Sequence, residues 1–454
     1  MNIFSNKKPD IINGNIEKTL IKLSAPIIVA MLLHTAFNII DAIFLGRFSS
    51  DALAAITITF PIIFFIIAIG SGVRIGATSL IARLIGAKKI DEARQAASHS
   101  ILIALVLTIV SVIIGFLFIE DIFILMGADA NIITLATDYI HIIFYGIVVM
   151  YLSFILNGIL HSEGDMRTSM KGMGLAVIIN IILDPILIFG LGPIPSLGIQ
   201  GAALATIFSR SIGLIYIINH FVKRRNIVTP VIRGFVYAPK TLKNIIRVGL
   251  PASLVNVSMS FSFIIITSFV AAFGAEAIAA FGAAVRIEMI GALPSMAMAS
   301  AIVTIVGQNA GVKKYCRVED TVKSAIKMLS IFMIIVAAIL IAFPEVFMRL
   351  FTEDQKVISI GATYLRIVPL GFIFVAIGSS ITSAFQGMGK GIPPLIFQIT
   401  RLFIVGIPLA YYLAFIAGWG VKGIWWSFVI ASLVTAIIAT IWFWKDIKGK
   451  EKEK

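Results

Sequence analysis

The sequence has few charged residues, a single cysteine and no polar stretch long enough to form a soluble domain. Only 13% of its 454 residues are Asp, Glu, Lys or Arg, against about a quarter in soluble domains. One cysteine, Cys316, excludes an intramolecular disulfide and offers no metal-binding set. No catalytic triad, zinc-protease motif or Walker motif is present, so we expect neither an enzyme nor an organic cofactor. Residues 1–15 lack the apolar core and cleavage site of a secretory signal, and we expect a cytoplasmic tail.

Apolar residues make up 59% of the chain and fall into long runs separated by short polar breaks. About 20 such residues suffice to cross a bilayer as a helix. Backbone groups in lipid must be hydrogen-bonded within the segment, so each run predicts a helix. We therefore expect an all-α membrane protein of twelve transmembrane helices. The predicted spans are residues 20–46, 55–82, 96–119, 131–158, 169–191, 198–222, 248–273, 277–310, 324–343, 357–383, 392–416 and 421–444.

Positive charge is concentrated on one side of the predicted membrane. Most of the 37 Lys and Arg residues lie in the two terminal segments and in every second loop. The opposite loops hold only Arg47, Arg349, Lys356 and Lys422. Positively charged loops remain in the cytoplasm, so both termini are predicted to be cytoplasmic. We expect a multi-pass protein of the plasma membrane. This distribution also accounts for the net charge of +14 without a nucleic-acid partner.

The two halves of the chain form an internal repeat. A shift of 225 residues places Pro26 on Pro251, Tyr139 on Tyr364, and the segment 86–89 (GAKK) on 311–314 (GVKK). Six spans per repeat means that both halves enter the membrane from the same side, as in parallel repeats of secondary transporters. The repeat predicts two pseudo-symmetric six-helix lobes. Their expected bounds are 1–222 and 248–454, with a basic cytoplasmic linker at 223–247.

Two acids inside apolar spans are the strongest functional signal. Asp41 lies in the first span and Asp184 in the fifth. A charged side chain at mid-bilayer costs about 2.5–3.5 kcal/mol, and such residues are usually functional. In the second repeat the matching positions are Ile266 and a position near Ile407. The fold therefore does not itself require these carboxylates.

Each acid follows an amide on the same helix face: Asn38 precedes Asp41 by three residues, and Asn180 precedes Asp184 by four. Carboxylate and amide oxygens suit a cation such as Na⁺, and the two acids could instead share a proton. The alternative is that each acid pairs with a buried base, for which Arg74 and Arg210 are available.

Other polar residues in the spans have two interpretations. Tyr139, Asn157 and Thr206 could line the same cavity as the acids, or form ordinary hydrogen bonds between helices. Pro26 and Pro185 interrupt helices, either as fixed kinks or as hinges. We expect His34 and His141 to make packing contacts. In the second half, Arg286, Glu288 and Arg401 form either a polar site or a structural network.

Several segments together resemble the MATE family, the multidrug and toxic compound extrusion transporters. They are LSAPIIVAMLLHTAFNIIDAIFLGRF with DALAAITITFP, GATSLIARLIGAKK, and GILHSEGDMRTSMKGMGLAVIINIILDPILIFG followed by GIQGAALAT. The resemblance covers nearly the whole chain and implies the MATE/MOP-type fold. It implies that Asp41, Asn180 and Asp184 surround the cation or proton site, with Thr206 added in some members. It also implies bending of the first helix at Pro26.

Acids are missing from the seventh and tenth spans, as in the DinF-type prokaryotic branch of this family. We therefore expect a monomeric antiporter that exports amphipathic, often cationic compounds by alternating access. The sequence leaves two coupling ions open. One is Na⁺, bound at Asp41, Asn180 and Asp184, and the other is H⁺. The alternative is a flippase for a lipid-linked oligosaccharide, which needs several inner arginines. The available ones are Arg74, Arg210, Arg286, Arg366 and Arg401.

Overall fold

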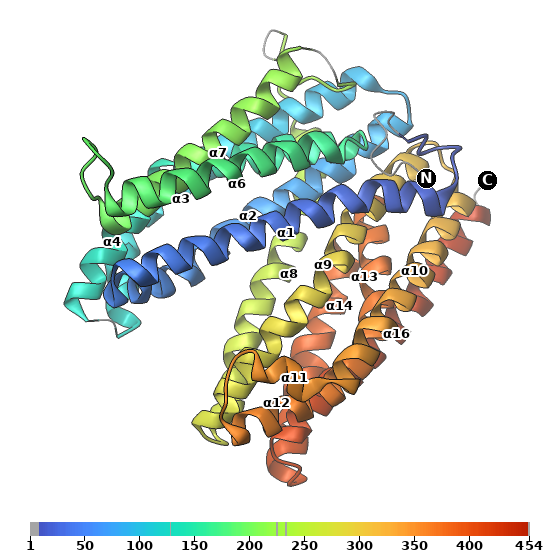
Figure 1. The fold of residues 1–454 in the computed structure, drawn as a ribbon. Helices are drawn as coiled ribbons and strands as arrows, with labels where there is room; N and C mark the ends of the chain where they lie inside the picture. The colour runs from blue at the N-terminus through green and yellow to red at the C-terminus, as the bar shows by residue number, and fades with distance from the viewer. Residues whose placement is uncertain (1–8, 128, 224–225, 232–233, 453–454) are drawn as a thin grey trace. The chain divides into compact units, whose positions relative to one another are not determined.

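A computed structural model describes residues 9–127, 129–223, 226–231 and 234–452, and nearly all of them are helical (Figure 1). The first half contains α1 (Ile16–Phe48), α2 (Ser50–Gly86), α3 (Ile90–Leu125), α4 (Ala130–Tyr145), α5 (Ile147–Ser162), α6 (Met166–Phe189) and α7 (Gly198–Val222). The second half contains α8 (Pro239–Ala271), α9 (Ala275–Gly311), α10 (Tyr315–Ala342), α11 (Pro344–Arg349), α12 (Gln355–Ile367), η1 (Val368–Gly371), α13 (Phe372–Gly387), α14 (Ile392–Ile399), η2 (Thr400–Gly406), α15 (Ile407–Tyr411), η3 (Tyr412–Ile416) and α16 (Val421–Lys452).

Eleven helical segments of the described chain are long and apolar enough to cross a membrane. The number is twelve if α4 and α5, which meet at an angle of 49°, form one span. The predicted all-α membrane class is therefore confirmed. The bend lies at Gly146, where a Cβ atom would overlap the side chain of Ile207 on α7. A larger residue there would separate α7 from the bend.

The sequence repeat is also visible in the backbone. Helices α2 and α9 each contain 37 residues, and both their first and last residues lie 225 positions apart. Directly after these helices, Lys88 and Lys313 adopt φ angles of 61° and 57°. They are the only residues other than glycine with positive φ in the described part of the chain. Because this conformation is uncommon for side chains with a Cβ, its recurrence supports a duplicated structure.

Contacts divide the chain into two compact units. The N-terminal unit is Ala25–Gly249, and the C-terminal unit joins the residues up to Ser24 to Leu250–Lys454. Helices α1 and α8 therefore each begin in one unit and continue in the other. Both changes of unit fall within two residues of an internal proline, Pro26 or Pro251. The lobe bounds given by the sequence stay a prediction.

The segment before α1 belongs to the C-terminal unit through contacts with α9 and α10. Asn309 donates to the carbonyl of Ile11 at 3.3 Å, and Arg317 donates to that of Gly14. Near Arg317, Tyr315 lies 4.9 Å from the ammonium group of Lys450 at the end of α16. Both ends of the described chain therefore lie at the same end of this unit (Figure 1).

Close packing of α6 on α7 positions the predicted site in the N-terminal unit. A Cβ atom on Gly213 of α7 would lie 2.7 Å from the carbonyl oxygen of Gly172 on α6, so only glycine fits. The two helices run side by side (Figure 1). Helix α6 carries Asn180 and Asp184, and α7 carries Thr206.

The predicted linker is held against the N-terminal unit. Glu163, after α5, accepts hydrogen bonds from the backbone N–H groups of Ile227 and Val228 at 3.0 and 2.7 Å. Ser98 of α3 exchanges two hydrogen bonds with the backbone of Val231. His99 accepts one from the N–H of Ala238 at 2.8 Å. These contacts fix residues 226–231 and 234–238 as an ordered strap leading to α8.

Candidate functional site

Asn180 and Asp184 form the centre of the candidate site, on consecutive turns of α6. Both side chains are fully buried. Asn180 Nδ2 donates to Asp184 Oδ1 over 2.8 Å, which confirms the predicted shared face. The other oxygens, Asn180 Oδ1 and Asp184 Oδ2, are buried without a hydrogen-bond partner. Such acceptors are costly to leave unsatisfied, so they can receive a ligand.

Asp41 of α1 lies close enough to Asp184 for the two carboxylates to repel each other. Its Oδ1 atom is also buried and has no hydrogen-bond partner. Tyr139 of α4 is buried and interacts electrostatically with both acids. The structure therefore brings Asp41, Tyr139, Asn180 and Asp184 together, from α1, α4 and α6.

Arg210 of α7 is a basic residue that interacts with this group. It interacts electrostatically with Asp41 and Tyr139. Its guanidinium carbon lies 5.8 Å from the ring centre of Phe37 on α1, and its Nε atom has no hydrogen-bond partner. Among the described residues, no ion pair joins Arg210 or Arg74 to either acid. The simple alternative of an acid locked to its own arginine is therefore not observed.

Two hydroxyl groups of α7 extend the set of unsatisfied polar atoms. Thr206 and Ser209 are buried, and neither hydroxyl has a hydrogen-bond partner. Thr206 was predicted as a supporting residue, whereas Ser209 was missed. Its spacing of three residues from Thr206 is the signal that could have found it, because residues at i and i+3 share a helix face.

Two predicted supporting residues have other surroundings. Asn38 is exposed and donates through Nδ2 to His34 Nδ1 over 3.2 Å, one turn away on α1. Asn157 of α5 has a buried, unpartnered Oδ1 atom. The next residue, Gly158, packs against Arg74 and Thr78 of α2. No contact of either asparagine with the acids is observed within the described residues.

Other residues singled out by the sequence lie in packing positions. Pro26 is buried within an uninterrupted α1. His141 stacks on Phe116 with ring centres 4.5 Å apart, in agreement with the expected packing role. The ring centres of His34 and Phe37 lie 6.2 Å apart. His34 also interacts electrostatically with Arg210.

The site suits a small cation better than a transition metal. Its free atoms are carboxylate, amide and hydroxyl oxygens, the ligands that hard cations prefer. No cluster of three or more His, Cys, Asp or Glu side chains with metal-binding geometry occurs in the described parts of the chain. A proton on one carboxylate would relieve the same repulsion. Both coupling ions therefore fit these residues.

In the C-terminal unit, the repeat counterpart of Tyr139 has a different partner. Tyr364 donates to the carboxylate of Glu288 on α9, and Glu288 also interacts electrostatically with Arg401. Arg286 is exposed and does not pair with Glu288, as their i, i+2 spacing predicts. This unit has an acid, but not at the positions of Asp41 and Asp184.

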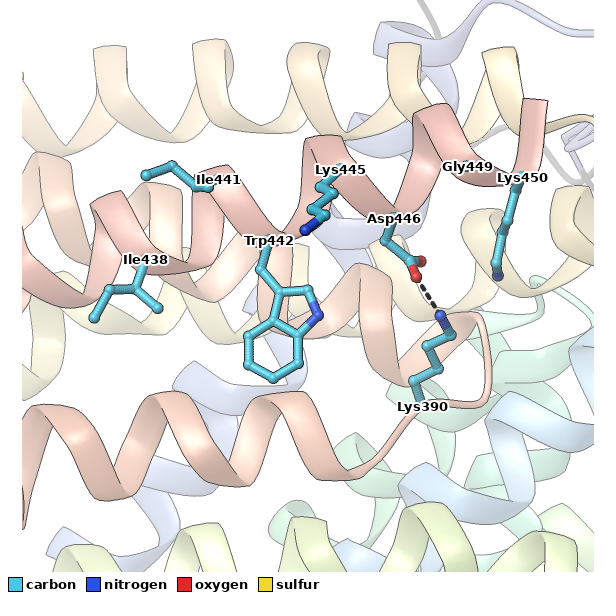
Figure 2. Close-up of a pocket in the computed structure, with 8 residues that line it drawn as sticks. All are labelled: Lys390, Ile438, Ile441, Trp442, Lys445, Asp446, Gly449 and Lys450. Atoms are coloured by element: carbon cyan, nitrogen blue, oxygen red, sulfur yellow. Dashed lines mark hydrogen bonds and ion pairs between the residues drawn. The ribbon is translucent and has the colours of Figure 1, made fainter. Parts of the chain in front are cut away.

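A separate cleft lies at the end of α16 in the C-terminal unit (Figure 2). Its volume is about 740 Å³. Asp446 pairs with Lys390 across it, while Lys445 and Lys450 lie along the same helix as Trp442. None of the predicted site residues lines this cleft.

A duplicated bundle of membrane helices with unpaired acids in one half defines a secondary transporter architecture. The MatE family model matches residues 26–186 and 251–412, one match in each half. The chain belongs to the MATE family. It is 29% identical to the FAD transporter of Shewanella oneidensis over 433 residues, 94% of each chain.

Two further comparisons agree with this assignment. Multidrug export protein MepA of Staphylococcus aureus is 28% identical over 425 residues, which cover 93% of this chain and 92% of MepA. A crystal structure of MATE in the bent conformation superposes with a TM-score of 0.93, at 31% identity and over 99% of both chains. The MATE fold is therefore confirmed for the whole chain.

Proposed function

We propose that this protein exports amphipathic compounds in exchange for H⁺ or Na⁺. One observation carries the proposal: Asp41 and Asp184 lie in one site, and each has a buried oxygen without a hydrogen-bond partner. Two unpaired carboxylates in a buried site repel each other and need a counter-charge or a proton. A site of this kind binds a cation when empty and becomes less negative when occupied.

The ion and the exported compound would act on the same two-state element. An ion entering from outside reduces the negative charge shared by Asp41 and Asp184, which weakens their repulsion and allows α1 and α6 to approach. The compound binds better to one of the two packings, so ion binding favours its release. Coupling requires only that the two ligands prefer different states. Antiport by alternating access follows if those states open to opposite sides.

The relatives support transport, and MepA supports export, but they differ in substrate. MepA is named for multidrug export and the Shewanella protein for FAD. The arginine contacts do not favour a lipid-linked oligosaccharide flippase. Arg366 pairs with Glu345 at 3.0 Å. Its charge is partly neutralised within the protein, whereas a pyrophosphate cavity needs several free arginines.

Ethidium efflux from proteoliposomes, driven by separate H⁺ and Na⁺ gradients, tests the proposal. We expect gradient-driven efflux to fall at least about a hundredfold in Asp41→Asn and Asp184→Asn, as expected when a coupling group is removed. Asp138→Asn is the matched control, because Asp138 lies outside the site and accepts a hydrogen bond from Gln200. Gradient-driven efflux at the wild-type rate in either site variant would contradict the proposal.

A further inference from the structure

Another cavity lies in the C-terminal unit, lined by residues of α8, α13, α14, η2 and α16. Its volume is about 190 Å³. Its lining includes the aromatic residues Phe374 and Phe397. It also includes the polar residues Gln398, Arg401 and Thr435. No acidic residue lines it. Nothing in the proposed coupling site, which lies in the other unit, explains this arrangement.

Two hydrogen-bond donors in the cavity wall are buried without a partner. They are Nε2 of Gln398 and the hydroxyl of Thr435. Helical threonines usually donate to the carbonyl four residues earlier, and Thr440 on the same helix does so, to Ala436 at 2.6 Å. Thr435 is only 6% exposed and makes no such bond. Leaving a buried donor unsatisfied is costly, so both groups are available for an acceptor.

Arg401 adds positive charge to these donors. It is the second residue of the π-helical stretch Thr400–Gly406, which precedes Pro408. Proline cannot donate a backbone hydrogen bond, and π-helical turns occur often at functional sites. Glu288 interacts with Arg401 electrostatically, yet no hydrogen bond or ion pair holds the guanidinium group among the described residues. Its N–H groups therefore remain free to bind an oxyanion.

The size of the cavity limits what can enter. An engineered apolar cavity of about 150 Å³ holds benzene, so 190 Å³ accommodates one aromatic ring with a small substituent. Drug-sized ligands need about 300 Å³ or more. Gly378 of α13 leaves room as well, because a Cβ atom there would meet no other atom within 4 Å.

We propose that this cavity binds the aromatic carboxylate group of an organic anion. Arg401 faces the carboxylate, Gln398 and Thr435 donate hydrogen bonds to it, and Phe374 and Phe397 contact the ring. A cation is disfavoured because the only charged lining residue is positive. This site is separate from the coupling acids. The binding of an aromatic carboxylate to it can therefore be measured directly, without a transport assay.

Radiolabelled benzoate tests the proposal on the purified full-length protein in phosphatidylcholine nanodiscs. We expect saturable binding of one benzoate per chain, which phenyl phosphate displaces but benzamide and benzamidine do not. Thr435→Val preserves shape and removes one donor, so benzoate should bind about tenfold more weakly, the usual effect of one hydrogen bond to a charged group. Thr440→Val is the matched control and should bind normally.

Gly378→Leu fills the cavity and should abolish binding without removing any polar group. Asp138→Asn, a change outside both sites, should bind benzoate as the wild type does. Circular dichroism melting confirms that each variant is folded. The proposal is wrong if the wild type shows no saturable binding, if Gly378→Leu binds normally, or if benzamide competes as well as benzoate.

A phospholipid phosphate has similar chemistry and is distinguished by a second set of nanodiscs. Benzoate affinity should be unchanged when part of the phosphatidylcholine is replaced by phosphatidylglycerol. A loss of benzoate binding in the anionic nanodiscs, restored as phosphatidylcholine is increased, would overturn the proposal in favour of a lipid headgroup.

Discussion

At the scale of single residues, the two amides that precede the acids have different roles. Asn180 is buried and holds Asp184 Oδ1 in place, whereas Asn38 is exposed and bonds to His34. The sequence shows both amides at helical spacing from an acid. It does not show which helix face each one occupies, because apolar residues surround all faces of these spans.

Replacing the two amides separately tests this difference. Asn180→Leu removes the donor to Asp184, and we expect gradient-driven ethidium efflux to fall at least about tenfold, the effect of one hydrogen bond to a charged group. Asn38→Leu should change efflux less than about twofold. Equal losses in the two variants would show that Asn38 belongs to the site after all.

Asp10, in the described segment before α1, makes a local pH-dependent turn. Its Oδ1 atom accepts hydrogen bonds from the N–H groups of Asn13 and Ile12 at 2.9 and 3.1 Å. The hydrogen bond from Asn13 is the main cause that lowers the pKa of Asp10 below its ordinary value of 3.8. A lowered pKa stabilises the turn at pH values above the ordinary one, and this stabilisation is lost as the pH falls through the lowered pKa.

We therefore expect the hydrogen-exchange protection of the Asn13 amide to fall below about pH 4, after correction for intrinsic exchange. The amide of Lys18 is an internal control. It donates to Asn15 Oδ1 at 3.0 Å, and this acceptor does not titrate. A parallel loss of protection at Lys18 would show general fraying instead.

At the scale of elements, the sequence predicted the spans well, because each long apolar run becomes a helix. The break between α4 and α5 was missed, since a single glycine within an apolar run is tolerated by many straight helices. The π-helical stretches were missed for a similar reason: Pro408 indicates a disturbance but not its form. The strap before α8 could not be predicted, since its contacts involve residues more than 60 positions away.

The strap offers a matched pair of serines on α3. Ser98 accepts from and donates to the backbone of Val231, whereas Ser100 donates only to Ala96 within its own helix. Ser98→Ala leaves the Val231 N–H unsatisfied and should destabilise the strap locally by about 1–3 kcal/mol.

Hydrogen exchange at Val231 measures this effect. We expect faster exchange at Val231 in Ser98→Ala and no change there in Ser100→Ala. Unchanged exchange in Ser98→Ala would mean that Glu163 and His99 hold the strap without Ser98.

At the scale of the whole molecule, duplication explains why the site could be found from the sequence. The second repeat keeps the shape-determining residues, and its backbone repeats the conformation of Lys88 at Lys313. The shape shared by the two repeats therefore does not require the acids that are present in only one of them. Arg210 and Ser209 were harder to place, because their relation to Asp41 depends on how α1, α6 and α7 pack. That packing is determined by close contacts such as Gly172 with Gly213, which carry no polar signal.

The most direct test of the central claim is ion release on substrate binding. Purified protein is mixed with ethidium in weakly buffered solution, and released H⁺ or Na⁺ is measured with ion-selective electrodes. We predict release from the wild type and from Asp138→Asn, and none from Asp41→Asn or Asp184→Asn. Undiminished release from either of the last two variants would contradict the claim that these carboxylates form one coupling site.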